Sequence, residues 1–238
     1  MHSYKFGFFT AFSIVLASMI GTGVFTSLGF QLLEIDSSFS ILLLWLIGGI
    51  IALSGAFVYA ELAVTFPQSG GEYVYLSKLI HPTVGFLSGW VSSTIGFAAP
   101  VALAAMALGS YVQSVFPAIS SKYCALLVVL IVTFIHVINL KKGGLFQRVF
   151  TSLKIAIIIV FIVAGFYFTP THTISILPNS NSWNEITSAG FWVSLIYIGY
   201  AYSGWNASTY LTEEIKDPRK NLPRSLFWGT LTVCIIYL

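Results

Sequence analysis

Charged residues are scarce in this chain of 238 residues, since Asp, Glu, Lys and Arg together make up 8% of it. A water-soluble domain carries roughly 25%, so the composition excludes that class and predicts an integral membrane protein whose surroundings are a lipid bilayer. The only two cysteines, Cys124 and Cys234, lie in apolar stretches, which argues against a structural disulfide. The net charge of +3 comes without a basic patch, so no nucleic acid partner is expected. The sequence also has no nucleophile and base pair, metal-ligand cluster or phosphate loop, so we expect no enzyme, no metal and no cofactor.

Long apolar runs are abundant instead, and about 20 apolar residues suffice to cross a bilayer as a helix. Six runs meet this need, and a seventh starts near Ser225 and reaches the last residue, Leu238. We therefore expect an all-α chain that is truncated within its seventh helix, with the later helices needed for function missing. The six predicted crossings cover residues 6–33, 37–60, 83–116, 123–140, 155–168 with the turns before it, and 186–212. Pro100 should bend the third of them.

The basic residues predict the orientation, because short cytoplasmic loops collect Lys and Arg. With the N-terminus in the cytoplasm, only Lys122 lies outside and only Lys154 lies within a crossing. The other nine then lie at the inner face: Lys5, Lys78, Lys141, Lys142, Arg148, Lys216, Arg219, Lys220 and Arg224. We expect a multi-pass protein of the cell membrane.

The first apolar run contains Gly21-Thr22-Gly23 at mid-membrane depth, which favours a break in the helix. A break frees backbone N–H and C=O groups that hydrocarbon cannot satisfy, so it should line a protein cavity. The restarting half-helix offers N–H groups and a positive dipole end to a carboxylate, and the ending half-helix offers carbonyls to an ammonium group. A zwitterion such as an amino acid matches both ends. Helix packing through small residues is the alternative explanation of these glycines.

A second glycine-rich stretch, near residues 200–204, lies in the middle of the sixth crossing. Two breaks five crossings apart, in helices that run in opposite directions, are typical of two inverted five-helix repeats. The sequence thus predicts a complete first repeat over residues 1–168, an extracellular loop over 169–188, and the start of a second repeat over 189–238.

Four ordered segments resemble the amino acid/polyamine/organocation (APC) superfamily of transporters. The first is Ile20-Gly21-Thr22-Gly23-Val24-Phe25, and the second runs from Gly55 to Trp90 as GAFVYAELAVTFPQSGGEYVYLSKLIHPTVGFLSGW. The third places Lys154 in FQRVFTSLKIAIIIVFIVAG, and the fourth, Tyr200 to Arg224, reads YAYSGWNASTYLTEEIKDPRKNLPR. The resemblance covers all six crossings and implies the LeuT-like 5+5 inverted-repeat fold.

The resemblance also implies where a substrate binds. The N–H groups of Thr22, Gly23 and Val24 would hold its carboxylate, and carbonyls near Met19, Tyr200 and Ser203 would hold its ammonium group. Tyr200 would also gate the site. The implied substrate-binding set is Met19, Ile20, Gly21, Thr22, Gly23, Val24, Tyr200, Ala201, Ser203 and Gly204.

Two ionisable residues complete the expectations. Lys154 lies about ten residues into its helix, ~15 Å from the inner end at 1.5 Å per residue, a depth at which such a residue usually faces a cavity. The resemblance implies that its ammonium group replaces a coupling sodium ion. A proton that leaves and rejoins Lys154 and a permanently charged strut remain alternatives, as does a snorkelling side chain without a role. Glu61, near the inner end of the second crossing, is a gate candidate or an interfacial hydrogen-bonding group.

We therefore expect a secondary, sodium-independent transporter of small, neutral amino acids, working as a proton symporter or as an exchanger. The competing expectation is a non-transporting fragment or a membrane assembly module of such a permease. A channel is disfavoured because no polar stripe runs through several helices.

Overall fold

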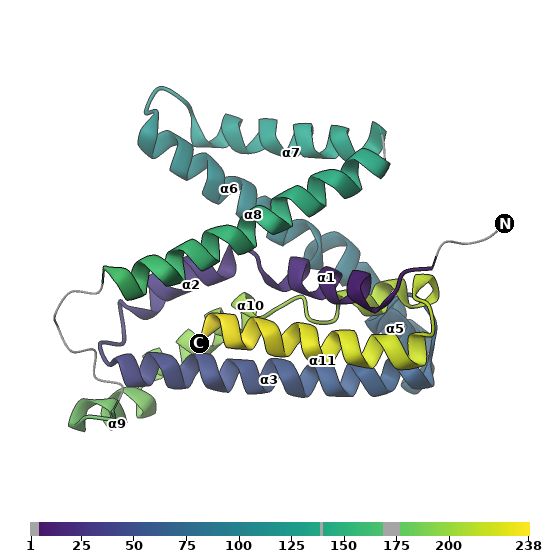
Figure 1. Cartoon of the computed structure of the whole chain (residues 1–238), viewed down its shortest axis with the longest axis horizontal. Coiled ribbons are helices and arrows are strands. Elements are labelled where there is room, and N and C mark those ends of the chain that lie inside the picture. Colours follow the sequence, from purple (N-terminus) through teal and green to yellow (C-terminus); the bar gives the residue numbers. More distant parts are fainter. Residues whose placement is uncertain (1–4, 139, 169–176) are drawn as a thin grey trace. The chain divides into compact units, whose positions relative to one another are not determined.

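Helices form almost all of the structure, a computed structural model that describes residues 5–138, 140–168 and 177–238 (Figure 1). Within these ranges there is no β-strand, and one isolated bridge joins Phe6 to Ile215. The all-α class expected from the composition is therefore correct. The chain divides into two compact units, one formed by Met1–Leu79 with Phe168–Leu238 and the other by Ile80–Tyr167.

Among the described residues, four stretches are long and apolar enough to cross a membrane: Phe8–Gln31, Ser38–Thr65, Pro82–Val115 and Val149–Tyr167. The other two predicted crossings correspond to shorter apolar helices over Ser121–Ile135 and Ala189–Ala201. Many large apolar side chains on these helices are exposed, as expected for surfaces that face lipid.

The first unit holds both glycine-rich stretches. Its helices are α1 (Phe8–Met19), α2 (Gly23–Gln31), α3 (Ser38–Thr65), α4 (Glu72–Leu79), α9 (Ser180–Thr187), α10 (Ala189–Ala201), the 3-10 helix η2 (Ala207–Glu214) and α11 (Pro218–Tyr237).

The centre of this unit is an antiparallel pair formed by α3 and α11, which lie side by side in Figure 1. The Phe57 and Phe227 rings are 5.2 Å apart at one end of the pair, and the Cys234 thiol donates to the Gly49 carbonyl at 3.6 Å further along it. The buried face of α3 carries small residues at helical spacing, which allow neighbouring backbones to approach closely. They are Gly48, Ala52, Ala56, Ala60 and Ala63.

The N-terminal end of α3 is capped by a side chain of α9, which lies in the segment expected to be an extracellular loop. The Glu185 carboxylate accepts the N–H groups of Asp36 at 3.1 Å and Ser37 at 3.2 Å, just before α3 begins. An acidic group is favourable at this positive end of a helix dipole. Within this segment Asn179 and Ser182 form a capping box that starts a short helix, and the extracellular loop over 169–188 stays a prediction. Residues 169–176 lie outside the described ranges.

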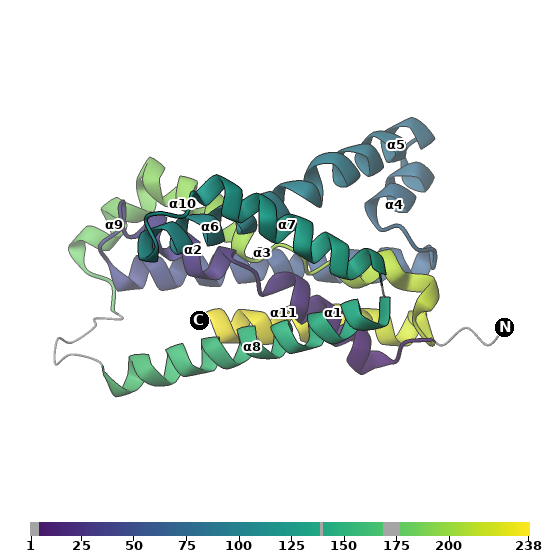
Figure 2. The same ribbon diagram turned by 90° about the horizontal axis from the view of Figure 1, so that it is seen from above.

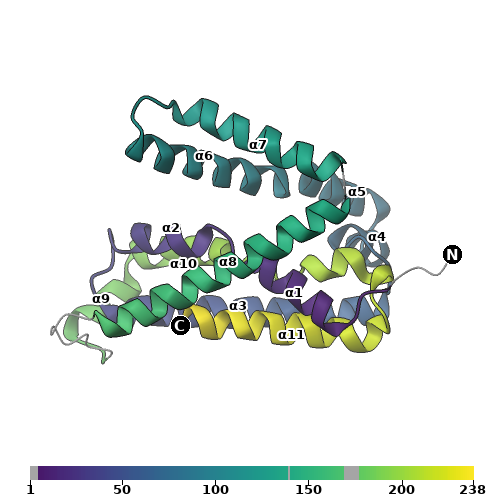
Figure 3. The same ribbon diagram turned by 45° about the horizontal axis from the view of Figure 1, so that its top comes forward.

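The second unit contains α5 (Pro82–Val91), the π-helix η1 (Ser92–Gly96), α6 (Ala98–Val115), α7 (Ser121–Ile138) and α8 (Leu140–Tyr167). Figures 2 and 3 show α6 and α7 as neighbouring antiparallel helices. The third crossing, in which Pro100 was predicted to cause a bend, has a π-helical turn, η1, just before that proline, where the Phe97 N–H bonds to the Ser92 carbonyl at 2.9 Å. Pro100 has no N–H to donate to the Gly96 carbonyl, and the wider turn accommodates this loss.

The seventh helix begins earlier than expected. Its predicted start was near Ser225, whereas α11 begins at Pro218 and includes the charged residues Arg219, Lys220 and Arg224. The pattern of apolar residues did not indicate this start, because the three cations lie within the first two turns of the helix. Proline at the first helical position was the available signal.

Candidate functional site

The first helix break lies between Met19, the last residue of α1, and Gly23, the first residue of α2. The Thr22 carbonyl accepts the Phe25 and Thr26 N–H groups, both at 3.1 Å, which starts the new helix. The Thr22 hydroxyl makes no capping bond to α2. Because the first N–H groups of a helix have no acceptor inside it, the start of α2 is suited to an anion.

The second break follows Ala201, where α10 ends. The chain then turns through residues 202–206 before η2 starts at Ala207. Within this turn Gly204 has φ = +97°, a left-handed conformation that side chains with a Cβ rarely adopt. The second break therefore depends on glycine at this position.

The two breaks are in direct contact with each other. A Cβ on Gly204 would be 2.6 Å from the Ser18 carbonyl oxygen, at the end of α1. A Cβ on Gly23 would be 2.8 Å from the Ala201 Cα, at the end of α10. Each break thus has a glycine where the backbone of the other broken helix lies next to it. The Ser27 hydroxyl adds a bond from α2 to the Tyr197 carbonyl of α10 at 3.2 Å.

The predicted substrate-binding residues all lie at these two breaks, with different exposure. The Tyr200 side chain is 38% exposed and Ser203 is also exposed, whereas Met19, Ile20 and Ala201 are at most 2% exposed. Gly23 is buried, and four other residues of the set are partly exposed: Gly21, Thr22, Val24 and Gly204. A ligand that approaches this site would therefore first contact the exposed and partly exposed side chains, those of Thr22, Val24, Tyr200 and Ser203.

Two carbonyls expected to receive an ammonium group are already hydrogen-bonded. The Met19 carbonyl accepts the Gly21 N–H at 2.9 Å and the Tyr237 hydroxyl at 3.1 Å. The Tyr200 carbonyl accepts both the N–H (3.1 Å) and the hydroxyl (2.7 Å) of Ser203. A carbonyl oxygen accepts with two lone pairs. An ammonium group can therefore bind the Met19 carbonyl only if the Tyr237 hydroxyl turns away, and the Tyr200 carbonyl only if the Ser203 hydroxyl turns away.

Tyr237 was not predicted from the sequence, and it belongs to a buried aromatic cluster behind the first break. Its ring lies 5.5 Å from Trp45 and 5.2 Å from Tyr202, measured between centroids. The Trp45 indole N–H donates to the Gln31 side-chain oxygen at 2.9 Å, and Gln31 is fully buried. This cluster links the ends of α2 and α10 to α3 and α11, and through the Tyr237 hydroxyl it also holds the Met19 carbonyl at the first break.

A second unpredicted group centres on Glu72, the first residue of α4. Its carboxylate accepts hydrogen bonds from the Asn206 amide and the Tyr210 hydroxyl. Gly71, with φ = +53°, precedes it and lies so close to Tyr210 that a Cβ would come within 2.8 Å of the ring. Glu72 thus fastens α4 to the turn and the 3-10 helix that follow the second break. In the sequence, the run Gly70-Gly71-Glu72 indicates a turn at this point, but it does not indicate which residues Glu72 contacts.

Aromatic rings surround this carboxylate. Tyr59 of α3 packs edge-on against Trp205 at 4.9 Å and against Tyr75 at 5.5 Å. Burial raises the pKa of the Tyr75 hydroxyl to about 12, and the nearby Glu72 carboxylate adds to the increase. Tyr75 is therefore neutral at pH 7 and adds no second negative charge beside Glu72.

Lys154 and Glu61 are the two remaining predicted residues. Lys154 is a half-buried residue of α8, which belongs to the second unit. Glu61 is an exposed residue of α3 in the first unit. Its backbone carbonyl accepts the Thr65 hydroxyl at 2.9 Å. Both keep the roles suggested by the sequence as predictions.

Comparison with known proteins identifies the family. A model of the amino acid permease family matches residues 6–238. The chain belongs to this family. The permease is 30% identical to the mouse b(0,+)-type amino acid transporter 1 over 98% of its own length and 49% of that protein. It is 32% identical to the serine/threonine exchanger SteT of Bacillus subtilis, with 98% and 53% covered.

The mouse Asc-type amino acid transporter 1 is a third relative, 30% identical over 98% of the permease and 46% of that transporter. The permease spans about half the length of these curated relatives. Two are named as amino acid transporters and one as an exchanger, so the resemblance to the APC superfamily is confirmed and the family is not one of enzymes.

Proposed function

We propose that this permease transports small, neutral amino acids across the cell membrane as a secondary transporter and binds them where its two helix breaks meet. The observation that carries the proposal is the reciprocal contact of Gly23 with Ala201 and of Gly204 with Ser18. It brings the N-terminal end of α2 and the C-terminal ends of α1 and α10 to one place. Amide donors and carbonyl acceptors on opposite sides suit a zwitterion.

In this proposal the N–H groups of Thr22, Gly23 and Val24 bind the carboxylate, with the Thr22 hydroxyl as a further donor. The ammonium group binds carbonyls at Met19 and Tyr200 after the hydroxyls of Tyr237 and Ser203 turn away from them. Tyr200, whose side chain is partly exposed beside this place, covers the bound substrate. Burial of Met19 and Ile20 leaves little room for a large side chain on that side, which favours a small substrate.

The coupling mechanism is proposed to be independent of sodium, with the Lys154 ammonium group acting in place of a coupling cation. Two modes fit a lysine there: proton symport if Lys154 gains and loses its proton, and exchange if it remains charged. The relative named as a serine/threonine exchanger supports both exchange and small neutral substrates.

For topology we propose the 5+5 inverted-repeat arrangement with a cytoplasmic N-terminus. The breaks of α1–α2 and α10–η2 are five crossings apart, and the cation-rich start of α11 would lie at the inner face. Glu61 near the inner end of α3 is then a candidate for the inner gate.

Equilibrium binding of radiolabelled serine, threonine and alanine to the purified chain in nanodiscs tests the proposal directly. We expect saturable binding in buffers with sodium and in buffers with choline instead. Gly23→Leu should abolish it, because the new side chain would collide with Ala201 and Tyr200. Gly29→Leu is the matched control in the same helix, since a Cβ on Gly29 meets nothing within 4 Å. Binding that survives Gly23→Leu at parental affinity would refute the site, and binding that requires sodium would refute the coupling mechanism.

A further inference from the structure

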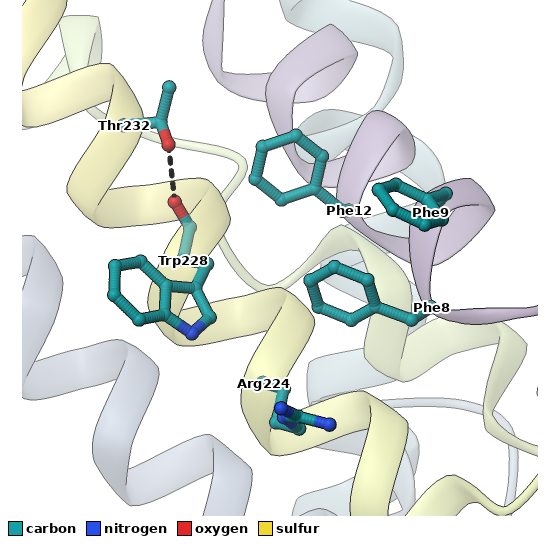
Figure 4. A pocket seen from close by; sticks show the side chains of 6 residues that line it. All are labelled: Phe8, Phe9, Phe12, Arg224, Trp228 and Thr232. Carbon is teal, nitrogen blue, oxygen red and sulfur yellow. Dashed lines mark hydrogen bonds between the residues drawn. The ribbon is translucent and has the colours of Figure 1, made fainter.

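A groove of about 450 Å³ lies between α1 and α11, away from the helix breaks. Phe8, Phe9 and Phe12 of α1 line one side of it, and Arg224, Trp228 and Thr232 of α11 line the other. Figure 4 shows the rings of Phe8 and Phe12 directed toward α11. Both helices belong to the first unit, so the groove is a feature of that unit alone.

The lining is apolar except for one cation. The Thr232 hydroxyl donates to the Trp228 carbonyl at 2.7 Å, which leaves its methyl group for a ligand. The Arg224 guanidinium carbon lies 6.0 Å from the centroid of the Phe8 ring, and Arg224 is exposed. In the part of the chain that the structure describes, no carboxylate pairs with this arginine. A ligand for the groove therefore needs a long apolar part and one anionic group.

The order of these residues along α11 matches the depth profile of a bilayer leaflet. Arg224 comes six residues after Pro218, about 9 Å along the helix axis at 1.5 Å per residue. Trp228 and Thr232 follow at one-turn intervals on the same face, toward the apolar end of the helix. Arg219 and Lys220 precede Arg224, so cations gather at the headgroup end and aromatic rings at the level below it.

We propose that this groove binds one anionic phospholipid, with its phosphate on Arg224 and an acyl chain along Phe8, Phe12 and Trp228. A sterol would leave the guanidinium group unpaired, and a zwitterionic phospholipid would bring its own ammonium group near the arginine. A soluble anion would not use the aromatic lining. Such a lipid would bridge α1, which ends at the first break, to α11. The inference needs only that the chain lies in a membrane, so it does not depend on amino acid transport.

Fluorescence quenching by brominated lipids tests this inference. The chain is reconstituted in phosphatidylcholine nanodiscs that contain an equal fraction of either brominated phosphatidylglycerol or brominated phosphatidylcholine. Because the chain has 6 tryptophans, the Trp228 signal is taken as the difference between the parent and Trp228→Phe. We expect phosphatidylglycerol to occupy the groove about fivefold more readily, since one Arg near an anionic surface contributes about 1 kcal/mol.

Arg224→Gln should remove this preference, Arg224→Lys should retain part of it, and Lys220→Gln, a control on the same helix, should retain it in full. Equal quenching by both lipids in the parent, or an unchanged preference in Arg224→Gln with parental circular dichroism, would overturn the proposal. The proposal would also be overturned if inorganic phosphate, added at constant ionic strength, removed the preference for phosphatidylglycerol, because the site would then bind a soluble anion. Absence of quenching by either lipid would show that protein, including a second copy of the chain, fills the groove.

Discussion

Gly204→Ala is the substitution that tests most directly whether the two helix breaks form one site. Gly204 has φ = +97°, and the left-handed region costs an L-residue roughly 1–2 kcal/mol. The new methyl carbon would also lie 2.6 Å from the Ser18 carbonyl oxygen and 2.8 Å from its carbonyl carbon. Overpacking of this kind costs about 1–3 kcal/mol. The total, about 2–5 kcal/mol, is relieved only if the turn after α10 moves away from the end of α1.

This movement separates the carbonyl ends of α1 and α10, which the proposed substrate needs at the same time. A loss of 2 kcal/mol in binding, the lower limit of the strain, corresponds to an increase in Kd of about 30-fold. The Kd of labelled serine is measured by scintillation proximity, and thermal unfolding is followed on the same samples. The loss of affinity should exceed what the unfolded fraction at the assay temperature explains.

Gly199→Ala is the matched control because Gly199 lies in α10 and a Cβ there meets nothing within 4 Å. Alanine is also the better helix former by about 1 kcal/mol, so this variant should be as stable as the parent or more so. If Gly204→Ala bound serine with parental affinity, contact between the breaks would have no role in recognition. Equal losses in both variants would point to general damage to α10.

Three further predictions concern other parts of the chain. Glu72→Gln replaces a carboxylate that accepts hydrogen bonds from Asn206 and Tyr210, and it should lower the free energy of unfolding by about 1.5–3 kcal/mol in chemical denaturation. Glu213→Gln, at an exposed position, is the control. Equal effects of the two substitutions would show that the hydrogen bonds of Glu72 do not stabilise the fold. Lys154→Gln removes the charge proposed to replace sodium, so serine binding should weaken about tenfold, equivalent to 1.4 kcal/mol, and an unchanged Kd would remove Lys154 from the mechanism. Glu185→Gln removes a negative charge from the start of α3 and should lower the free energy of unfolding by about 0.3–1 kcal/mol. The melting temperature of the variant should therefore be lower than that of the parent and should not fall further in high salt. A melting temperature equal to the parent's would show that the interaction adds nothing.

The sequence was most informative where one residue type suffices to define the structure. Apolar runs and scarce charge predicted membrane helices, and the caps explain several boundaries, such as Ser37 before α3. Pro100 indicated an irregular helix because its missing N–H is a local property. The start of α11 was misplaced because three cations hide the apolar periodicity of its first turns, although Pro218 marks the boundary.

Local patterns of this kind could not predict contacts between residues that are far apart in the sequence. Tyr237 contacts the Met19 carbonyl across 218 positions, and nothing in either neighbourhood specifies the other. Glu72 and Asn206 are separated by 134 positions, and only the fold brings the acceptor to the donor. The glycines indicated breaks in their own helices. Their close approach to the opposite break depends on how the half-helices pack together, which periodicity does not encode.

The contacts around the breaks also divide the half-helices into two pairs. On one side the Phe6 N–H bonds to the Glu214 carbonyl at 2.7 Å, and the Lys216 N–H bonds to the Phe6 carbonyl at 2.8 Å, which fastens the start of α1 to the end of η2. On the other side the Ser27 hydroxyl and the stacked rings of Phe30 and Tyr197, 5.2 Å apart, join α2 to α10. Separating the members of a pair would break these bonds. Rotating one pair against the other would keep them, but it would bend the backbone at the breaks and change contacts with α11, such as the bond from the Tyr237 hydroxyl to the Met19 carbonyl. We therefore expect each pair to move as one body, with the proposed substrate site at the hinge between them.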